Sequence, residues 1–377
     1  MLDLKEARKN IDAIDKQIVE LFEKRMLEAN AVAEYKRKTG KAVYDKERED
    51  EKLENLGQLS SNEFNKKAIV ELFSQIMSIS RKYQYTVLPQ TSKLADFKKA
   101  EELPAGPDTK VCYFGVPGAH THQAMEDFFG EEITGISSPT FQSVMEAVEQ
   151  GEADYGVLPI ENSSTGGITA NYDLLLNYSN CIVGQYVNRI EQCLLALPGV
   201  AIEELRTVFS HPQGLLQCSG FLKEHPELGQ IEFSNTATAA KKVAEDGERS
   251  QAAIAAKRAA KEYGLQVLKE GIQQEKNNST RFIVIGREPI YLADSNKIAL
   301  CIELSHECGS LYRILSHFLF NGLNMTQIES RPMQGKNWEY RFFIDIEGNL
   351  EDPSVQNALR GIKEEAKSVR VLGNFKC

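Results

Sequence analysis

The amino-acid sequence predicts a multidomain chain with an all-α domain at residues 1–88, a two-lobed α/β domain at 110–290 and an α+β domain at 296–377. Three patterns support this prediction. Helical periodicity dominates the first part, short apolar segments alternate with small-residue turns and helices in the second, and the third reads βαββαβ. A chain of 377 residues is also too long for one ordinary hydrophobic core.

The bulk composition narrows the class of protein. With 42% apolar and 26% charged residues, the chain is typical of soluble globular proteins. It contains no run of about 18 apolar residues, so we expect no membrane span, and its start lacks the apolar segment of a secretion signal. The seven cysteines are scattered singly, which predicts reduced thiols in the cytoplasm and neither a disulfide framework nor a zinc site.

The net charge of −10 argues against a nucleic-acid partner. The one candidate for such a partner is the basic run "YKRKTGK" at residues 35–41. Short basic runs of this kind are usually solvated helix ends, and we prefer that interpretation.

The first helix is expected over residues 4–38, with Gly40 as a stop signal. Its apolar residues recur at helical spacing for roughly 50 Å, and neither Pro nor Gly interrupts them. Such a helix cannot fold alone, so we expect it to pack against a partner, such as a second copy of the chain. Two shorter helices are expected over residues 45–56 and 63–85, the latter opened by a capping box of Ser60 and Glu63.

Charged side chains interrupt the apolar stripe of the first helix. Arg25 stands where packing alone would place Leu or Ile, and Lys36 projects from the same face three turns later. Buried cations without a partner cost several kcal/mol, so these groups would need an anion between them. The alternative is that both side chains reach water or pair with Glu28 and Glu34.

Further polar residues share helix faces with this pair. Ser80 and Gln84 continue the apolar face of the third helix, whereas Asp45, Arg48 and Glu49 share a face of the second. Arg8 lies roughly 26 Å from Arg25 along the helix and about 100° around it. If Arg8 contributes to the same pocket, it must do so from the other subunit of a dimer.

With these residues, the first 88 positions resemble the all-helical chorismate mutase of the bacterial bifunctional P-proteins, and the resemblance continues to the C-terminus. In that family the helical domain is an intertwined dimer, and one arginine of the long helix enters the partner's site. The resemblance therefore implies a homodimer or higher homo-oligomer. The family's cationic and polar pattern falls on Arg8, Arg25, Lys36, Asp45, Arg48, Glu49, Ser80 and Gln84.

Chorismate is a dianion whose pericyclic rearrangement to prephenate needs no nucleophile, metal or cofactor. Arginines suit its two carboxylates, and we expect Arg8, Arg25 and Arg48 to bind them with the help of Asp45 and Ser80. Lys36 and Gln84 are expected to donate to the ether oxygen as the C–O bond breaks, and Glu49 to hold the ring hydroxyl. A millionfold acceleration requires only about 8 kcal/mol, which positioning and electrostatics supply.

Residues 89–109 are rich in charge, Pro and Gly and are expected to form a linker. From Lys110, strands such as "VCYFG", "YGVLPI" and "TRFIVIG" predict a parallel sheet with helices packed on it. Several turns place hydroxyls and amides at helix starts. Each one alone is ordinary capping, but together with "NNSTRF" they suggest an anion cleft between two lobes.

This second region resembles prephenate dehydratase, whose fold is similar to that of two-lobed periplasmic-type binding proteins. The motifs are "PIENS" at 159–163, "SHPQ" at 210–213 with Gln217, and "TRF" at 280–282. The resemblance implies that Thr280 is the residue most involved in catalysis. It also implies a prephenate cleft formed by Glu161, Asn162, Ser163, Ser210, Gln217 and Arg281.

Prephenate loses CO₂ and its ring hydroxyl together, so a proton donor and an apolar setting for the carboxylate would help. Threonine is a poor acid, so we expect Thr280 to orient and to donate a hydrogen bond. The sequence does not assign the proton donor. His120, His122 and His211 are candidates, although histidine is more often structural. The loop at 115–121 departs from the family's usual Gly-Pro-x-Gly followed by a hydroxyl residue and an aromatic.

The last part predicts strands at 297–304, 324–330, 340–347 and 368–375 and helices at 310–321 and 353–366, the order of a ferredoxin-like module. It resembles the regulatory ACT domain of the same family, which binds phenylalanine at a dimer interface. Tyr312 is bulkier than the residue usual there, which bears on the identity of the effector. The alternative is a module that only dimerises. The implied effector residues are Gly309, Ser310, Leu311, Glu329, Ser330, Arg331 and Pro332.

Taken together, these patterns and resemblances predict a cytoplasmic bifunctional enzyme of phenylalanine biosynthesis. It would convert chorismate to prephenate and prephenate to phenylpyruvate, under feedback inhibition by L-phenylalanine and with no cofactor, nucleic-acid partner or membrane. One alternative is the same architecture with one activity decayed. Another is a non-enzymatic amino-acid sensor, which should carry an output module such as a helix-turn-helix.

Overall fold

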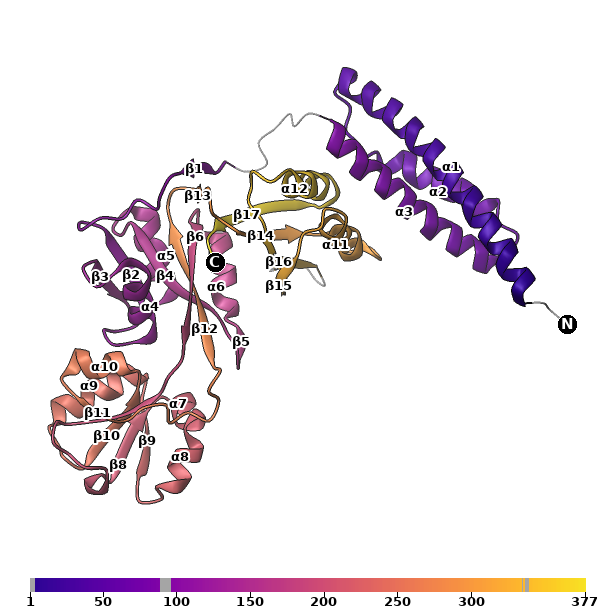
Figure 1. Ribbon diagram of the computed structural model, residues 1–377. Coiled ribbons are helices and arrows are strands. Elements are labelled where there is room, and N and C mark those ends of the chain that lie inside the picture. Colours follow the sequence, from indigo (N-terminus) through magenta and orange to yellow (C-terminus); the bar gives the residue numbers. More distant parts are fainter. Residues whose placement is uncertain (1–3, 89–95, 334, 336–338) are drawn as a thin grey trace.

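The computed structural model describes residues 4–88, 96–333, 335 and 339–377. A helical arm lies at one end, the C-terminal module next to it, and two further lobes beyond (Figure 1). The arm consists of α1 (Leu4–Thr39), α2 (Lys46–Gln58) and α3 (Glu63–Val87), which confirms the three predicted helices. None of the described helices is both long enough and apolar enough to cross a membrane.

The start of α3 differs from the prediction. Asn62 caps the helix by accepting a hydrogen bond from the backbone N–H of Asn65 at 2.8 Å. Ser60 instead donates to the carbonyl of Gly57 at 2.6 Å and so closes the end of α2. The predicted capping box of Ser60 and Glu63 is therefore wrong, because an asparagine two residues later satisfies the same free N–H groups.

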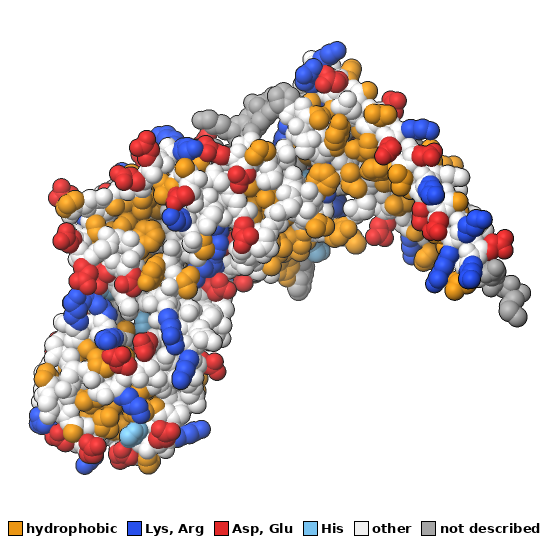
Figure 2. All heavy atoms as spheres, in the orientation of Figure 1, with side chains coloured by type: hydrophobic (Ala, Val, Ile, Leu, Met, Phe, Trp, Pro, Cys, Tyr) orange, Lys and Arg blue, Asp and Glu red, His pale blue; other side chains and the backbone are white. Residues whose placement is uncertain are grey.

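The apolar stripe of α1 is divided into two parts. Near its C-terminal end, Ala29 and Ala33 are buried, and α1 packs there against α3. Toward its N-terminus, Ile11, Ile14 and Ile18 are 54–55% exposed. Apolar side chains are visible along this arm in Figure 2. An exposed stripe of this length indicates a surface that a single chain does not cover.

The first lobe forms one end of a ten-stranded sheet in which β6, β12, β4, β2 and β3 are consecutive. Pairing of β2 with β3 and β4 is parallel, as predicted, but β12 is antiparallel to both β4 and β6. The chain leaves this lobe after β6 and returns along β12, so the two strands run in opposite directions (Figure 1). The bounds in this lobe are β2 (Lys110–Phe114), α4 (His120–Phe129), β3 (Thr134–Ser138), α5 (Phe141–Gln150), β4 (Tyr155–Asn162), β5 (Gly166–Gly167), α6 (Thr169–Asn177), β6 (Cys181–Arg189) and β12 (Ser279–Gly286).

The second lobe contains a five-stranded sheet in the order β11-β7-β10-β8-β9, and its core consists of two separate apolar clusters. Strand β7 runs antiparallel to its neighbours, whereas β8 is parallel to β9 and β10. The bounds are β7 (Cys193–Ala196), a 3₁₀ turn (Ile202–Glu204), β8 (Thr207–Ser210), α7 (Pro212–Gln217), α8 (Ser219–Glu224), β9 (Gly229–Glu232), α9 (Thr236–Asp246), β10 (Gln251–Ala255), α10 (Lys257–Tyr263) and β11 (Gln266–Lys269).

The C-terminal module has the predicted βαββαβ order, with its antiparallel strands arranged β15-β16-β14-β17. This is the ferredoxin-like arrangement. Strand β17 also touches β6 of the first lobe, where Gly373 pairs with Ile182. A Cβ at Gly373 would lie 2.1 Å from the carbonyl oxygen of Ile182, so only glycine fits. The bounds are β14 (Lys297–Glu303), α11 (Ser310–Phe320), β15 (Met325–Pro332), β16 (Tyr340–Glu347), α12 (Pro353–Glu365) and β17 (Ser368–Phe375).

The second half of the predicted linker at 89–109 is packed on the rest of the chain. Residues 89–95 lie outside the described residues, but β1 (Lys98–Ala100) pairs with β13 (Ile290–Leu292). The Tyr155 hydroxyl also donates to the carbonyl of Pro104 at 2.8 Å. The second half of this segment is therefore docked on the first lobe by backbone pairing, which its composition did not reveal. All seven cysteines are free thiols, and five of them are buried.

Candidate active sites

The helical arm brings several of the predicted polar residues together on the facing sides of α1 and α3. Arg25 donates to the Ser80 hydroxyl at 2.5 Å, and Ser80 in turn donates to the carbonyl of Ile76 at 2.8 Å. Burial lowers the pKa of Arg25, while the nearby Glu49 carboxylate opposes that effect. The half-buried cation is thus bonded only to neutral oxygens, of Ser80 and Ile76, in the part of the chain that the structure describes, an arrangement that an anionic ligand would stabilise.

Lys36 and Gln84 complete the same cluster. Lys36 donates to the carbonyl of Val43 at 2.6 Å. Burial lowers the pKa of Lys36, and the carboxylates of Glu364, Asp45 and Glu49 oppose this shift. The side-chain oxygen of Gln84 is buried, with no hydrogen-bond partner among the residues that the structure describes. The unpartnered Gln84 oxygen could accept a hydrogen bond from a ligand, and Lys36 supplies a positive charge near Glu49.

Glu49 has a partner that the sequence did not predict. Arg81 on α3 is buried, forms an ion pair with Glu49, and lies over the ring of Tyr44 at 4.7 Å. Arg81 is one residue beyond Ser80 and four beyond Met77. It does not belong to the cationic and polar pattern of the family, so the sequence did not single it out. Its spacing of four residues from Met77 and from Tyr85, both buried, is the signal that helical phasing offers.

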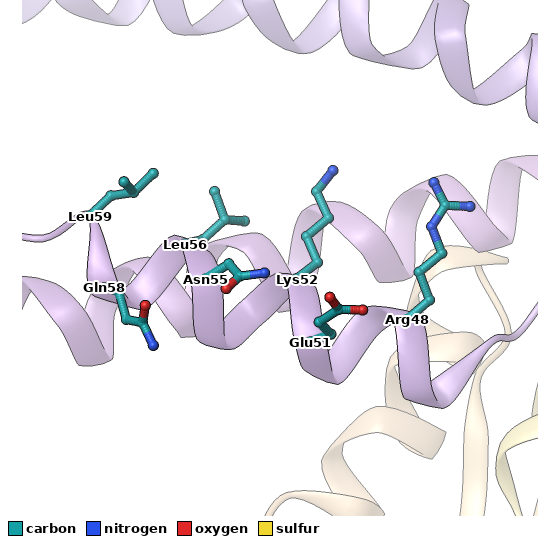
Figure 3. A pocket seen from close by; sticks show the side chains of 7 residues that line it. All are labelled: Arg48, Glu51, Lys52, Asn55, Leu56, Gln58 and Leu59. Atoms are coloured by element: carbon teal, nitrogen blue, oxygen red, sulfur yellow. The ribbon is translucent and has the colours of Figure 1, made fainter.

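Asp45 and Arg48 occupy the start of α2. Asp45 caps the helix by accepting from the backbone N–H of Arg48 at 3.3 Å. The Arg48 side chain is exposed and, with Lys52, Leu56 and Leu59, points to one side of α2 beside an open pocket of about 690 Å³ (Figure 3). Arg8 is exposed on α1, and no described contact joins it to the Arg25 cluster.

In the first lobe, strand pairing brings Thr280 beside Asn162. The two residues are register partners on β12 and β4, and the Asn162 amide donates to the Thr280 hydroxyl at 2.9 Å. The same amide donates to Asn278 at 2.8 Å, while the Asn162 side-chain oxygen accepts from the backbone N–H of Ser164 at 3.0 Å. Thr280, Asn162 and Asn278 thus form a fixed polar cluster.

Other residues of the predicted cleft contribute in different ways. Ser163 joins the cluster, because its hydroxyl donates to the Asn278 side-chain oxygen at 3.4 Å. Gln217, in the second lobe, accepts from Gln192 at 3.2 Å. Ser210 is wholly buried and donates to the carbonyl of Ile254 at 2.7 Å, which joins β8 to β10. Its substrate role remains a prediction.

Arg281 lies elsewhere than predicted. It follows Thr280 on β12, so its side chain leaves the opposite face of the strand. It forms ion pairs with Asp345 at 2.5 Å and with Glu161 at 3.2 Å, and it donates to Gln327. Arg281 therefore binds both Glu161 and the C-terminal module, and the expectation that Arg281 lines a cleft together with Thr280 needs correction.

The three candidate histidines have distinct surroundings. His211 caps α7 by accepting from the backbone N–H of Gln213 at 3.2 Å, and His122 accepts from that of Gly118 at 3.0 Å. Both contacts are structural. Both ring nitrogens of His120 are buried, and neither has a hydrogen-bond partner in the described part of the chain. Burial lowers the pKa of His120 to about 4, so its ring is neutral near pH 7.

The predicted effector residues contact two different neighbours. Gly309 begins α11 with a φ of 75°, Leu311 packs on the core of the C-terminal module, and Ser310 lines a cavity of about 180 Å³. That cavity is also lined by Tyr44 and Lys46 of the arm. On β15, Arg331 pairs with Asp173 of the first lobe at 2.6 Å, whereas Ser330 and Pro332 lie in register with β16. Glu329, on the same strand, lies near Gly167.

Comparison with known proteins gives consistent matches. Residues 111–290 match the prephenate dehydratase family, and residues 7–85 match chorismate mutase type II. A bifunctional chorismate mutase/prephenate dehydratase of Aquifex aeolicus is 33% identical over 380 residues, covering 100% of this chain and 98% of that protein.

Two solved structures cover 71% of this chain. Prephenate dehydratase of Arthrobacter aurescens in complex with L-Phe is 32% identical, with a TM-score of 0.65 and 90% of its own chain covered. A protein described as a novel type of quorum quenching acylase, GqqA, is 29% identical, with a TM-score of 0.67 and 98% of its chain covered.

Proposed function

The chain belongs to the family of bifunctional chorismate mutase/prephenate dehydratases, and from this premise we propose how its sites divide the work. The enzyme rearranges chorismate to prephenate and converts prephenate to phenylpyruvate. We assign the first step to residues 1–88 and the second to residues 110–290. The observation that carries the first assignment is a half-buried cation, Arg25, bonded to Ser80 on α3, with the half-buried Lys36 on the same helix.

For the mutase step, the cations hold the dianion folded so that its reacting ends meet. Arg25 and Arg48 bind carboxylates, with Ser80 and Asp45 fixing the geometry. Lys36 and Gln84 donate to the ether oxygen, on which negative charge grows as its bond to carbon breaks. Because these donors are in place before the reaction, they stabilise the transition state without reorganising. Glu49 accepts a hydrogen bond from the ring hydroxyl.

For the dehydratase step, Thr280 orients the departing hydroxyl of prephenate. The Asn162 amide donates to the Thr280 oxygen, which leaves the threonine proton free to point at the substrate. Asn278 accepts from both Asn162 and Ser163 and so holds Asn162 in place, and Gln217 contributes from the second lobe. An acylase would need a nucleophile beside a base. The amide partner of Thr280 favours the dehydratase over the activity described for GqqA.

The mutase site is shared between two copies of the chain. The exposed stripe at Ile11, Ile14 and Ile18 fits the same stripe of a second copy, and burial of such side chains stabilises by about 1.5–3 kcal/mol each. The open pocket beside Arg48 and Lys52 offers room for a partner helix. Arg8 of one copy would then reach the Arg25 cluster of the other.

Residues 296–377 form an ACT domain that binds L-phenylalanine and inhibits the enzyme. The support is the ferredoxin-like order of this module and the L-Phe complex of the Arthrobacter prephenate dehydratase. The effector would contact Gly309–Leu311 of one chain and Glu329–Pro332 of another. The free thiols are typical of a reducing compartment, which supports a location in the cytoplasm.

Separate supply of each substrate to the purified protein tests this assignment. A Thr280→Ala variant should consume chorismate at the wild-type rate but prephenate roughly a hundredfold more slowly than the wild type. An Arg25→Ala variant should consume prephenate at the wild-type rate but should no longer consume chorismate. If both variants lost both activities, the division between the two regions would be wrong.

A further inference from the structure

The last turn of α12 places two carboxylates beneath the helical site. Glu364 accepts hydrogen bonds from the backbone N–H of Tyr44 at 2.8 Å and from the Tyr85 hydroxyl at 2.9 Å. Glu365 accepts two from Arg81, at 3.1 Å from Nε and 2.9 Å from Nη2. The Glu365 side chain is only 4% exposed. The C-terminal module therefore contacts the arm through hydrogen bonds and a buried ion pair. Buried polar contacts of this kind favour one relative position of the two parts more strongly than solvated contacts do.

Arg81 connects this carboxylate to a residue of the candidate mutase site. One edge of its guanidinium faces Glu365, and its remaining terminal nitrogen, Nη1, donates to Glu49. The ring of Tyr44 covers its face at 4.7 Å. A planar guanidinium with a bonded partner at each end has little freedom to rotate, so the position of Glu49 depends on Glu365.

The side chains around these groups are tightly packed. A Cβ at Gly361 would lie 2.3 Å from Cε1 of His317 and 3.1 Å from Cε2 of Tyr85. His317 is wholly buried, and its Nε2 lies 3.1 Å from Glu365. Helices α3, α11 and α12 can meet this closely only because position 361 carries no side chain. The contact is therefore shaped for one arrangement of the arm and the module.

We propose that Arg81 and Glu365 are positioning residues of the chorismate rearrangement, and that the C-terminal module thereby holds Glu49 of the mutase site in place. Glu365 fixes Arg81, and Arg81 holds one carboxylate oxygen of Glu49 so that the other faces the substrate's ring hydroxyl. The link joins residues 284 positions apart in the sequence. It rests on the proposed mutase function and deepens it, because nothing in the family assignment gives α12 a part in this step.

The same contact connects the mutase site to the effector loop. The cavity that Ser310 lines is bounded by Glu364 and Glu365 as well as by Tyr44 and Lys46. Lys46 bridges it through an ion pair with Glu307 at 3.0 Å. A molecule bound against Ser310 would therefore lie beside Glu365, the carboxylate that holds Arg81.

The test uses the full chain and a Glu365→Gln variant, which keeps the shape of the side chain and removes its charge. Its mutase kcat/KM should fall about tenfold or more, the effect expected when a buried charge-assisted hydrogen bond is lost. Dehydratase activity in the same sample, the internal measure of folding, should stay within about twofold. Glu351→Gln is the matched control, because Glu351 forms an exposed ion pair with Lys99 and should leave both activities unchanged.

A double variant separates positioning from general structural damage. In a Glu49→Ala background, adding Glu365→Gln should cause no further loss, since Glu365 acts only through Glu49. Arg81→Lys should behave like Glu365→Gln in both backgrounds, because one ammonium cannot span the two carboxylates.

Three results would overturn the inference while the proposed function stands. The first is a mutase kcat/KM of Glu365→Gln that equals or exceeds that of an active wild type. The second is an equal loss of both activities in that variant, and the third is an additive loss in the Glu49→Ala background. A wild-type chain without mutase activity would instead overturn the proposed function itself, and the inference with it.

Discussion

Arg281 of β12 forms an ion pair with Asp345 of β16 at 2.5 Å, across the joint between the first lobe and the C-terminal module. The neighbouring Thr280 leaves the other face of the same strand and accepts from Asn162. Adjacent residues of one strand thus serve the dehydratase cluster on one side and the C-terminal module on the other. A displacement of β16 would therefore move Arg281, the residue directly after Thr280.

We therefore expect Asp345→Asn to weaken feedback inhibition. The half-inhibitory concentration of L-phenylalanine for prephenate turnover should rise about tenfold, a coupling of about 1.4 kcal/mol. The free energy of unfolding should fall by about 3 kcal/mol, because Arg281 loses a buried partner. Asp294→Asn removes an exposed ion pair with Lys376 and serves as the control. Unchanged inhibition in Asp345→Asn would refute the coupling.

Thr280→Ala should lower the dehydratase kcat roughly a hundredfold, because it removes one preorganised hydrogen-bond donor. Thr280→Ser keeps the hydroxyl and should retain most of the activity. Phenylpyruvate formation from prephenate measures both. A Thr280→Ala enzyme close to wild type would show that the hydroxyl does not participate.

Mixing Arg8→Ala with Arg25→Ala chains should restore mutase activity that neither variant has alone. In a mixed dimer, one site receives Arg25 from the first chain and Arg8 from the second. A random mixture should therefore reach about a quarter of wild-type activity, since about half of its dimers are mixed and each has one complete site. Verified mixed dimers without activity would show that Arg8 does not cross between chains.

Stability should decline as the pH falls from about 6.5 to about 4 because of His120. Burial lowers its pKa to about 4, so over this range the unfolded chain binds a proton that the folded chain does not. The contribution amounts to at most about 3 kcal/mol and is fully lost below pH 4. Urea titrations at several pH values should show a smaller decline in His120→Phe. An identical decline in both proteins would mean that His120 is not the group responsible.

The sequence was informative where the signal is local. The uninterrupted stripe from Leu4 onward and the βαββαβ order of the last part both predicted elements that the structure contains. The antiparallel course of β12 was missed, because the direction of a strand depends on the path of the chain through the other lobe. The cap of α3 was misplaced by two residues, since Ser60 and Asn62 carry the same kind of capping group.

The candidate sites divide in the same way. Arg25, Lys36 and Ser80 could be found because helix geometry fixes which faces they share. Arg81 and Glu365 could not, because their contact joins two regions that no periodicity relates. For Arg281, the motif suggested a cleft residue, but the alternation of side chains along a strand directs it to the C-terminal module.

A single time course starting from chorismate tests the central claim most directly. With the purified chain and no other enzyme, chorismate should disappear, prephenate should rise and fall, and phenylpyruvate should accumulate to match the chorismate consumed. Chorismate that persists, or prephenate that accumulates without phenylpyruvate, would contradict the account of one chain with two working sites.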